Sequence, residues 1–419
     1  MSGSGLSEGG NGQLDPRHSS ATEPPGIAVP PGGAEPEAAK EEVFEEAGEP
    51  RFFEDPKKIV QTALVVLLLV AAIYFLLPAL IGVEDGIAEL GRADPVWIGV
   101  ALAFSVAMFV SYVALFKGVV GERIRLRWRE SYEITMAGLA ATRLFSAGGA
   151  GGIVLTYWAL RKAGMPQKQS ACRMVAFLVL LYAVYMLALV LTGILLRTGV
   201  LPGPAPAGLT VVPAAFGGAV IVIFGLIALV PGDLERRFSE ASQETFTGRT
   251  MRRLATVPST LASGTRTAFA FIREPSRGGL AVAGAVGFWA TNIAILWACF
   301  EAFGVEVPIA VLVQGFFVGM LANLIPLPGG VGGVDAGMIG SFLLFDLPGV
   351  AESKVIAAVF LYRLIAFWLP LLPGMVAFFQ LRGTVSRWER DRSALASNAD
   401  PGDRRPPAPS QPITSESKV

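Results

Sequence analysis

The chain of 419 residues is 53% hydrophobic and only 16% charged, and its mean hydropathy is +0.55. Soluble domains carry about a quarter charged residues, so this composition excludes an ordinary water-soluble enzyme and indicates a membrane protein. The 34 basic and 34 acidic residues cancel, and the one histidine is His18. Neither a basic surface for nucleic acid nor a histidine cluster for a metal is present in this pattern. We therefore expect no nucleic-acid partner, no metal ion and no cofactor.

The two ends of the chain differ from its middle. Residues 1–50 are rich in Gly, Pro, Ser and acidic residues, and such a segment buries too little apolar surface to offset its ordering entropy. We predict a disordered tail there, and a second one over residues 386–419, where charges alternate with Pro and Ser. The transmembrane domain is predicted over residues 51–385. No signal-peptide pattern precedes the first apolar run, so we expect that run to stay as an anchor.

Eight apolar stretches fill the predicted domain. Six have about the 20 residues needed to cross the hydrocarbon core, at residues 58–82, 97–116, 174–196, 211–230, 279–300 and 355–381. The stretches 131–161 and 308–345 are interrupted by Gly and Pro, and arms of about 13 to 18 residues are too short to span. Broken backbone is tolerated at membrane depth only where protein or water satisfies it. We interpret both stretches as re-entrant hairpins whose tips face an interior site.

Basic residues are distributed unevenly among the loops. Seventeen of them lie within residues 117–129, 161–173 and the amphipathic linker 232–277, whereas the other loops contain only Arg92, Arg197 and Lys354. The positive-inside rule then makes the first three loops cytoplasmic. With both termini in the cytoplasm no loop violates the rule. We expect a multi-pass protein of the cell membrane.

When the sequence is shifted by 181 residues, the glycine-rich motif at residues 148–152 aligns with that at 329–333, and the apolar spans on either side of them also align. Two units, 97–197 and 278–381, each then consist of a span, a hairpin and a span. The charge pattern gives them opposite orientation, which is typical of secondary transporters with inverted repeats. Chance alignment of glycine-rich stretches is the alternative. The predicted fold is an all-α polytopic membrane protein with six full transmembrane helices and two re-entrant hairpins in an inverted repeat.

Charged residues inside the hairpins and the last span are the candidate site. Arg143 precedes the first glycine motif, whose free backbone N–H groups and helix dipole favour an anion. A charge near mid-membrane is costly and usually faces a cavity or a partner, so Arg143 suits a lipid phosphate. The alternative is an arginine that snorkels or bonds the loose carbonyls of the hairpin.

Asp335 begins the returning arm of the second hairpin, and Arg363 lies about nine residues, or roughly 13 Å, into the last span. A buried pair costs less than an isolated ion, so the two could brace hairpin and span. Alternatively Arg363 holds a phosphate, and Asp335 takes up a proton or orients the arginine. The candidate lipid-headgroup residues are Arg143, Gly148, Gly149, Gly151, Gly152, Asn323, Pro326, Pro328, Gly329, Gly330, Gly332, Gly333, Asp335 and Arg363.

The segment IPLPGGVGGVDA at 325–336, followed by Leu361-Tyr362-Arg363, resembles the flippase-like transmembrane region of lysylphosphatidylglycerol synthases and of stand-alone proteins that share it. The stretch 148–164 is similar to the companion motif, and the resemblance covers about residues 51–385. Asp335 stands where the family commonly has Glu, and Ala147 where it often has Pro. The resemblance implies translocation of an anionic phospholipid or a polyprenyl-linked lipid. It does not imply the synthase reaction, because only a polar tail follows where the synthases have an aminoacyl transferase domain.

Membrane lipids are thus the expected partners, and we expect no enzymatic activity of the chain itself. A membrane-embedded lipid or glycosyl transferase, an accessory subunit of one, and a non-catalytic scaffold are the alternatives. Among protein partners, a second copy of the chain and a separate lipid-modifying enzyme both stay open.

Overall fold

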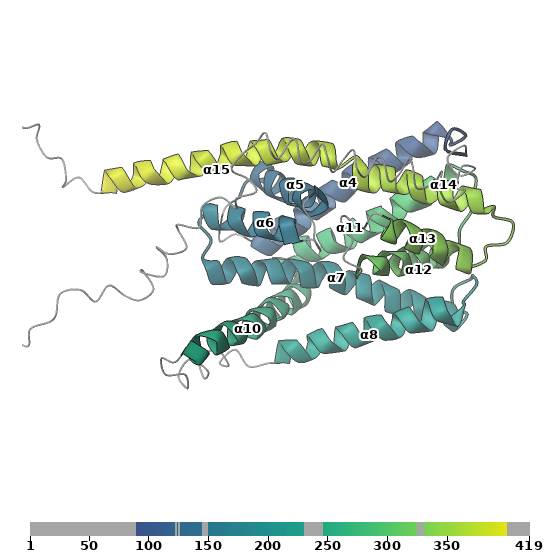
Figure 1. Ribbon diagram of the computed structural model, residues 1–419, viewed down its shortest axis with the longest axis horizontal. Helices are drawn as coiled ribbons and strands as arrows, with labels where there is room; N and C mark the ends of the chain where they lie inside the picture. Colours follow the sequence, from purple (N-terminus) through teal and green to yellow (C-terminus); the bar gives the residue numbers. More distant parts are fainter. Residues whose placement is uncertain are drawn as a thin grey trace, which may run out of the picture. The chain divides into compact units, whose positions relative to one another are not determined.

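The computed structural model describes residues 89–399, with the exception of 122–123, 125, 145–149, 230–245, 325–329 and 331. Helices make up all the regular secondary structure of this described part (Figure 1). This agrees with the predicted all-α fold. The predicted first span, 58–82, lies outside the described residues.

Five helices of the described part are long and apolar enough to cross a membrane. They are α4 (Pro95–Val120), α7 (Gln167–Arg197), α8 (Ala207–Leu229), α11 (Pro275–Glu301) and a last helix composed of α14 (Glu352–Arg363), η4 (Leu364–Trp368) and α15 (Leu371–Ala399). Each coincides with one of the five later predicted spans. Each helix begins before its predicted span, since caps lie outside the apolar run: Asp94 accepts a hydrogen bond from the Val96 N–H to begin α4.

Two pairs of shorter helices occupy the stretches predicted as hairpins. The first pair is α5 (Trp128–Leu144) and α6 (Ala150–Lys162), and the second is α12 (Ile309–Met320), extended by η2 (Leu321–Leu324), and α13 (Gly333–Leu344). We call these pairs hairpin 1 and hairpin 2. The longest single helix among them has 17 residues, or about 26 Å, which is less than the hydrocarbon thickness. Hairpin 1 lies toward the end where α15 projects, and hairpin 2 toward the opposite end (Figure 1).

Small residues allow the arms of each hairpin to pack closely. A Cβ on Gly152 would overlap the Thr142 hydroxyl and the Gly138 carbonyl, so α6 contacts the α5 backbone directly. In hairpin 2, a Cβ on Gly319 would come within 2.6 Å of the Met338 Cα. Such contacts are typical of helix pairs in membranes, where dispersion rather than the hydrophobic effect holds helices together.

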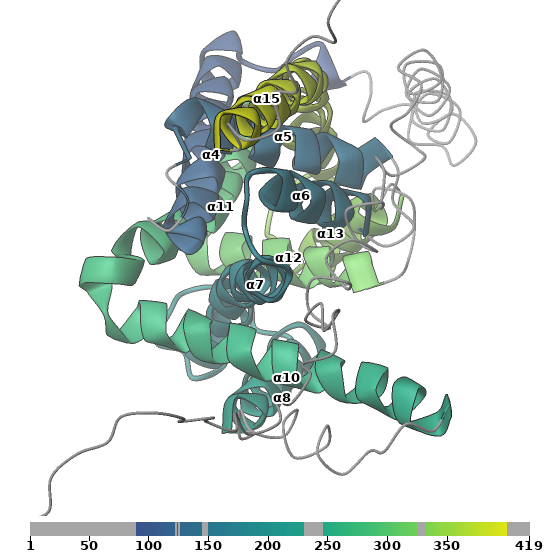
Figure 2. The same cartoon turned by 90° about the vertical axis from the view of Figure 1, so that its left-hand side faces the viewer.

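The two long helices α4 and α11 form an antiparallel seam. Gly118 near the end of α4 packs on Ala281 near the beginning of α11, and Leu115, one turn earlier in α4, packs on Gly284, one turn later in α11. Because residue numbers fall along one helix as they rise along the other, the two helices run in opposite directions. Figure 2 shows them side by side.

The first arm of each hairpin packs on a long helix from the other half of the chain. α5 lies along α15, where Gly374 accommodates Ala140. α12 lies along α7, where the Tyr185 hydroxyl donates a 2.6 Å hydrogen bond to the Phe317 carbonyl. The two halves are therefore interleaved.

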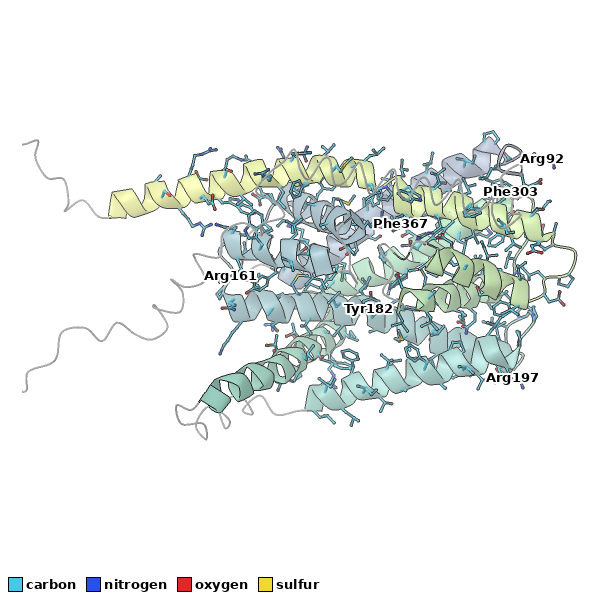
Figure 3. All side chains as sticks on the ribbon, in the orientation of Figure 1. Arg92, Arg161, Tyr182, Arg197, Phe303 and Phe367 are labelled. Carbon is cyan, nitrogen blue, oxygen red and sulfur yellow. The ribbon has the colours of Figure 1, made fainter. Side chains whose placement is uncertain are left out.

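Loops predicted on opposite sides of the membrane lie at opposite ends of the helices. Arg161 lies at one end, whereas Arg92, Arg197 and Phe303 lie at the other (Figure 3). Arg161 belongs to a loop predicted to be cytoplasmic, and Arg92 and Arg197 belong to loops predicted to be outside. Phe367 and Tyr182 lie between these ends (Figure 3).

The linker 232–277 contains a long helix, α10 (Phe246–Arg273). It packs on α7, where Gly264 fits against Val175 and Cys172. Buried Ala262, Thr265 and Ala268 alternate with exposed Arg266 and Arg273, as expected for an amphipathic helix.

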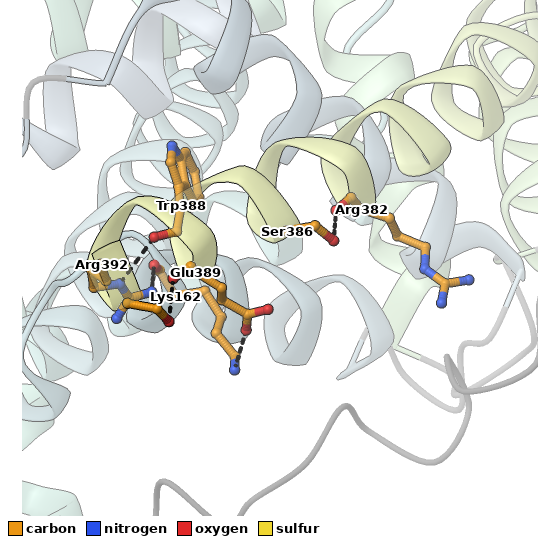
Figure 4. Close-up of polar contacts among 7 residues, drawn as sticks. Lys162, Arg382, Ser386, Trp388, Glu389 and Arg392 are labelled. Atoms are coloured by element: carbon orange, nitrogen blue, oxygen red, sulfur yellow. Dashed lines mark hydrogen bonds and ion pairs between the residues drawn. The ribbon is translucent and has the colours of Figure 1, made fainter. Parts of the chain in front are cut away.

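The prediction of a disordered tail from residue 386 is wrong for residues 386–399, which continue α15 as a helix. The Glu389 side chain pairs with the Lys162 ammonium at 2.7 Å, and Arg392 donates to the Lys162 carbonyl (Figure 4). Composition misled here because Arg, Glu, Ala and Leu are strong helix formers. A helix that emerges from the membrane also needs no new nucleus.

Candidate functional site

The last membrane helix is broken where α14 meets α15. Pro370 has no N–H, so the Ala366 carbonyl lacks its α-helical donor. The chain there widens into the π-helix η4, in which the Leu369 N–H bonds the Leu364 carbonyl five residues back at 3.0 Å. Loose carbonyls at membrane depth need a substitute donor.

Arg143 supplies that donor. From the last turn of α5, its Nη2 donates to the Ala366 carbonyl at 3.0 Å and its Nη1 donates to the Phe367 carbonyl. The alternative prediction, an arginine that bonds loose carbonyls, is thus partly right. The carbonyls belong to the last helix and not to hairpin 1, because Pro370 and not the glycine motif exposes them.

Asp335 and Arg363 form the predicted ion pair. The Arg363 Nε lies 2.7 Å from the Asp335 Oδ1, and both side chains are buried. The other carboxylate oxygen of Asp335 accepts a 2.8 Å hydrogen bond from the Gly332 N–H at the start of α13. Both oxygens of Asp335 are therefore engaged, and the carboxylate fixes the beginning of α13 to α14.

The Phe367 ring connects the two arginines. The guanidinium carbon of Arg143 lies 4.8 Å from the ring centroid and that of Arg363 lies 4.3 Å from it. The two guanidinium carbons are thus within about 9 Å of each other. The two guanidinium groups also repel each other electrostatically. Two positive charges and one negative charge converge at the break, so the group formed by Arg143, Asp335, Arg363 and Phe367, which we call the arginine site, carries an excess positive charge.

The predicted glycine motifs reach this region only in part. Gly148, Gly149, Pro326, Pro328 and Gly329 lie outside the described residues. Gly151 and Gly152 begin α6, where Gly152 serves the close contact with α5. In hairpin 2, Gly330 and Gly332 adopt φ of +65° and +78°, conformations that favour glycine, before Gly333 begins α13. The Asn323 side chain lies against Gly330 and is exposed.

Several buried polar residues were not among the candidate residues from the sequence. The Tyr362 hydroxyl donates to the Asn292 Oδ1 at 3.0 Å, and the buried Gln314 amide donates to the Leu209 carbonyl at 2.7 Å. The buried carboxylate of Glu133, on α5, was also missed. It lies inside the stretch 131–161, so the rule that singled out Arg143, a charge within an apolar arm, would have found it. The break itself had a signal in Pro370, a proline inside a long apolar run.

Within the part of the chain that the structure describes, no group of three or more His, Cys, Asp or Glu side chains is placed to hold a metal ion. The polar groups of the arginine site are guanidinium groups and one engaged carboxylate. Such a set suits recognition of an anion through hydrogen bonds and charge.

Comparison with known proteins gives a family. Residues 60–374 match the family described as "Lysylphosphatidylglycerol synthase TM region". Curated UPF0104 membrane proteins of Methanothermobacter thermautotrophicus are similar over shorter stretches: one is 33% identical over 105 residues, which cover 25% of this chain and 30% of the relative. Another is 34% identical over 93 residues, which cover 22% of this chain and 26% of the relative. The chain thus aligns with less than a third of the length of these relatives.

Proposed function

We propose that this chain, which belongs to the lysylphosphatidylglycerol synthase transmembrane-region family, translocates an anionic phospholipid or a polyprenyl-linked lipid across the cell membrane. One observation carries the proposal. The guanidinium groups of two arginines contact a single aromatic ring at the break in the last helix, and one carboxylate, that of Asp335 in hairpin 2, pairs with Arg363.

The excess charge of the arginine site favours an anion. Asp335 balances one guanidinium, and a cation–π contact with Phe367 weakens but does not cancel the second charge. A charge is costly at this depth, and Phe367 lies between the two ends of the helices (Figure 3). A lipid phosphate would supply the missing negative charge and accept hydrogen bonds from the guanidinium, while the lipid tails stay in the bilayer.

The placement of the helices supports two units related by the 181-residue displacement. Shifted by 181, α4 becomes 276–301 and α5 becomes 309–325, close to α11 and to α12 with η2. α6 becomes 331–343, close to α13. The third element, α7, becomes 348–378, which falls on α14, η4 and the beginning of α15.

Equivalent contacts support opposite orientation of the units. α4 and α11 are equivalent under the displacement, and they pack antiparallel. Arg173 at the start of α7 donates to the Val119 carbonyl at the end of α4, at 2.8 Å. Its equivalent Lys354 donates to the Phe303 carbonyl just beyond α11, at 2.9 Å. In transporters with inverted repeats, such units enclose a shared site near the midplane, which is where we place the arginine site.

A reconstitution assay tests the proposal. The purified full chain is placed in vesicles containing NBD-labelled phosphatidylglycerol or NBD-labelled phosphatidylcholine, and dithionite quenching reports movement between leaflets. We expect faster movement of the phosphatidylglycerol probe, loss of that movement in Arg143→Ala and Arg363→Gln, and partial rescue by Arg143→Lys, which supplies charge without the planar fork. The exposed Arg92 provides the control Arg92→Ala, which should move lipid normally.

Two results would contradict the proposal. Equal rates for both probes would show that the excess positive charge does not favour the anionic lipid. Undiminished movement in folded Arg143→Ala and Arg363→Gln would show that the arginine site does not handle the headgroup.

A further inference from the structure

Glu133 forms a second buried polar network on hairpin 1, separate from the arginine site. The Thr384 hydroxyl, on α15, donates to the Glu133 Oε2 at 2.6 Å, and the Arg129 Nε donates to the Glu133 Oε1 at 2.9 Å. The Arg387 Nη2 donates to the Thr384 oxygen at 2.8 Å. Glu133 and Thr384 are buried, whereas the Arg129 side chain is 70% exposed. The buried bond therefore joins α5 to α15.

The Glu133–Thr384 hydrogen bond and the hydrogen bonds of Arg143 hold opposite ends of the contact between α5 and the last helix. Glu133 and Arg143 are ten residues apart on α5, or about 15 Å. Glu133 bonds Thr384 on α15, and Arg143 bonds the carbonyls of η4 just before α15 begins. Between them α15 packs closely on α5 at Gly374, where a Cβ would lie 2.7 Å from the Ala140 Cβ. Loss of either end bond would let α5 move along or away from α15.

We propose that Glu133 is a positioning residue for lipid translocation: it seats hairpin 1 on α15 and so places Arg143 at the break in the last helix. The inference rests on the proposed function for its link to transport, although the seating itself does not depend on it. The Lys162–Glu389 pair joins the same elements farther along (Figure 4). That pair is partly exposed, and such pairs contribute little.

Hairpin 2 contains a matched arrangement without charge. Gln314, 181 residues after Glu133, is buried on α12 and accepts a hydrogen bond from the Thr192 hydroxyl on α7. In hairpin 2 an amide oxygen is therefore the acceptor at the position that the Glu133 carboxylate has in hairpin 1. By this logic Glu133→Gln keeps the bond from Thr384, and Arg129 turns to solvent. Glu133→Ala loses the bond and leaves the buried Thr384 hydroxyl without its acceptor.

Thiol labelling measures the seating directly. Ala377 is fully buried and shares the face of α15 that carries Gly374 and Thr384. The test uses Ala377→Cys in a full chain whose own cysteines are removed by Cys172→Ser and Cys299→Ala. This protein is treated with a small methanethiosulfonate reagent, and the rate of labelling is measured. We expect Glu133→Ala to raise the labelling rate at least tenfold and Glu133→Gln to stay within twofold of the parent. Thr192→Val, which removes the matched bond in hairpin 2, should also stay within twofold.

The lipid assay then links seating to transport. Glu133→Ala should lose the preference for NBD-phosphatidylglycerol over NBD-phosphatidylcholine as Arg143→Ala does, and Glu133→Gln should restore it. If Glu133→Ala does not fold, Thr384→Val removes the same bond from α15 and takes its place. The inference is overturned if folded Glu133→Ala or Thr384→Val leaves the labelling rate of Ala377→Cys unchanged. It is also overturned if Glu133→Gln lets Ala377→Cys label as fast as Glu133→Ala does. A parent that moves no lipid but labels as expected refutes the proposed function and leaves the seating role intact.

Discussion

Asp335→Asn tests whether the pair with Arg363 braces hairpin 2 against the last helix. The side chains are 8% and 6% exposed and 2.7 Å apart, so solvent screens the pair little. Removal of the carboxylate leaves a buried guanidinium uncompensated, and such changes cost about 3–5 kcal/mol. The asparagine carbonyl can still accept from the Gly332 N–H, so the cap of α13 is retained. Asp335→Ala loses that cap too, and we expect about 1 kcal/mol more.

The double variant Asp335→Asn with Arg363→Gln separates a brace from other roles. Both charges are then gone, and the two amides can bond each other across the same gap. We expect the double variant to recover most of the loss of either single one, with a coupling energy of about 2 kcal/mol or more. Equilibrium unfolding of the purified chain in detergent, followed by tryptophan fluorescence, measures the three variants against the parent.

Two outcomes would refute this reasoning. A loss below about 1 kcal/mol in Asp335→Asn would mean that the pair contributes as little as an exposed one. If the double variant lost as much free energy of unfolding as the two single variants added together, the two residues would act independently. Transport gives a separate test: a proton-coupling carboxylate, when changed to Asn, should leave the fold intact and make translocation indifferent to a proton gradient.

Three further predictions concern the break, the seam and the topology. Pro370→Ala restores the missing N–H donor in the last helix, so Arg143→Ala should lower the melting temperature less in that background than in the parent. Gly284→Leu places side-chain atoms on the α4 backbone, and we expect the free energy of unfolding to fall by about 3 kcal/mol. Cysteines at the exposed residues 167 and 348 should react with an impermeant reagent from the cytoplasm and from outside, respectively.

Each of these has a control. Gly279 on the same helix meets nothing within 4 Å of a built Cβ, so Gly279→Leu should change stability by less than about 0.5 kcal/mol. If Arg143→Ala lowered the melting temperature equally in the parent and in Pro370→Ala, Arg143 would not be needed to bond the carbonyls that Pro370 leaves without a donor. Labelling of positions 167 and 348 from the same side would contradict the opposite orientation of the two units.

The long helices were predictable because crossing a membrane imposes a length and a composition on a chain. Their ends were less so, since α11 begins at Pro275, four residues before the predicted span, where a proline at N1 and not hydropathy sets the boundary. The polar end of α15 was missed for a related reason. It continues the apolar helix that precedes it, and hydropathy does not reveal such a continuation or its contacts with α6.

The sequence predicted the charges of the arginine site and the partner of Arg363, but not the partners of Arg143. A buried ion requires a partner, and the Asp335–Arg363 pair followed from that requirement. Nothing in the sequence says that α5 packs on α15, so Arg143 was placed beside its own glycine motif instead of at Pro370. Phe367, which both guanidiniums face, is one phenylalanine among 26, and only the tertiary contact distinguishes it.

The helix α8 has a consequence for how such a chain is assembled. Along the sequence it lies between the two proposed units. It packs mainly on α7, and many of its apolar side chains are exposed. A unit of two crossings and a hairpin that returns to its own side brings the chain back to the face from which it started. A copy joined directly would therefore insert in the same direction as the first. In the proposed topology α8 adds a single crossing, so that α11 would enter the membrane from the face opposite to α4, as their antiparallel packing requires.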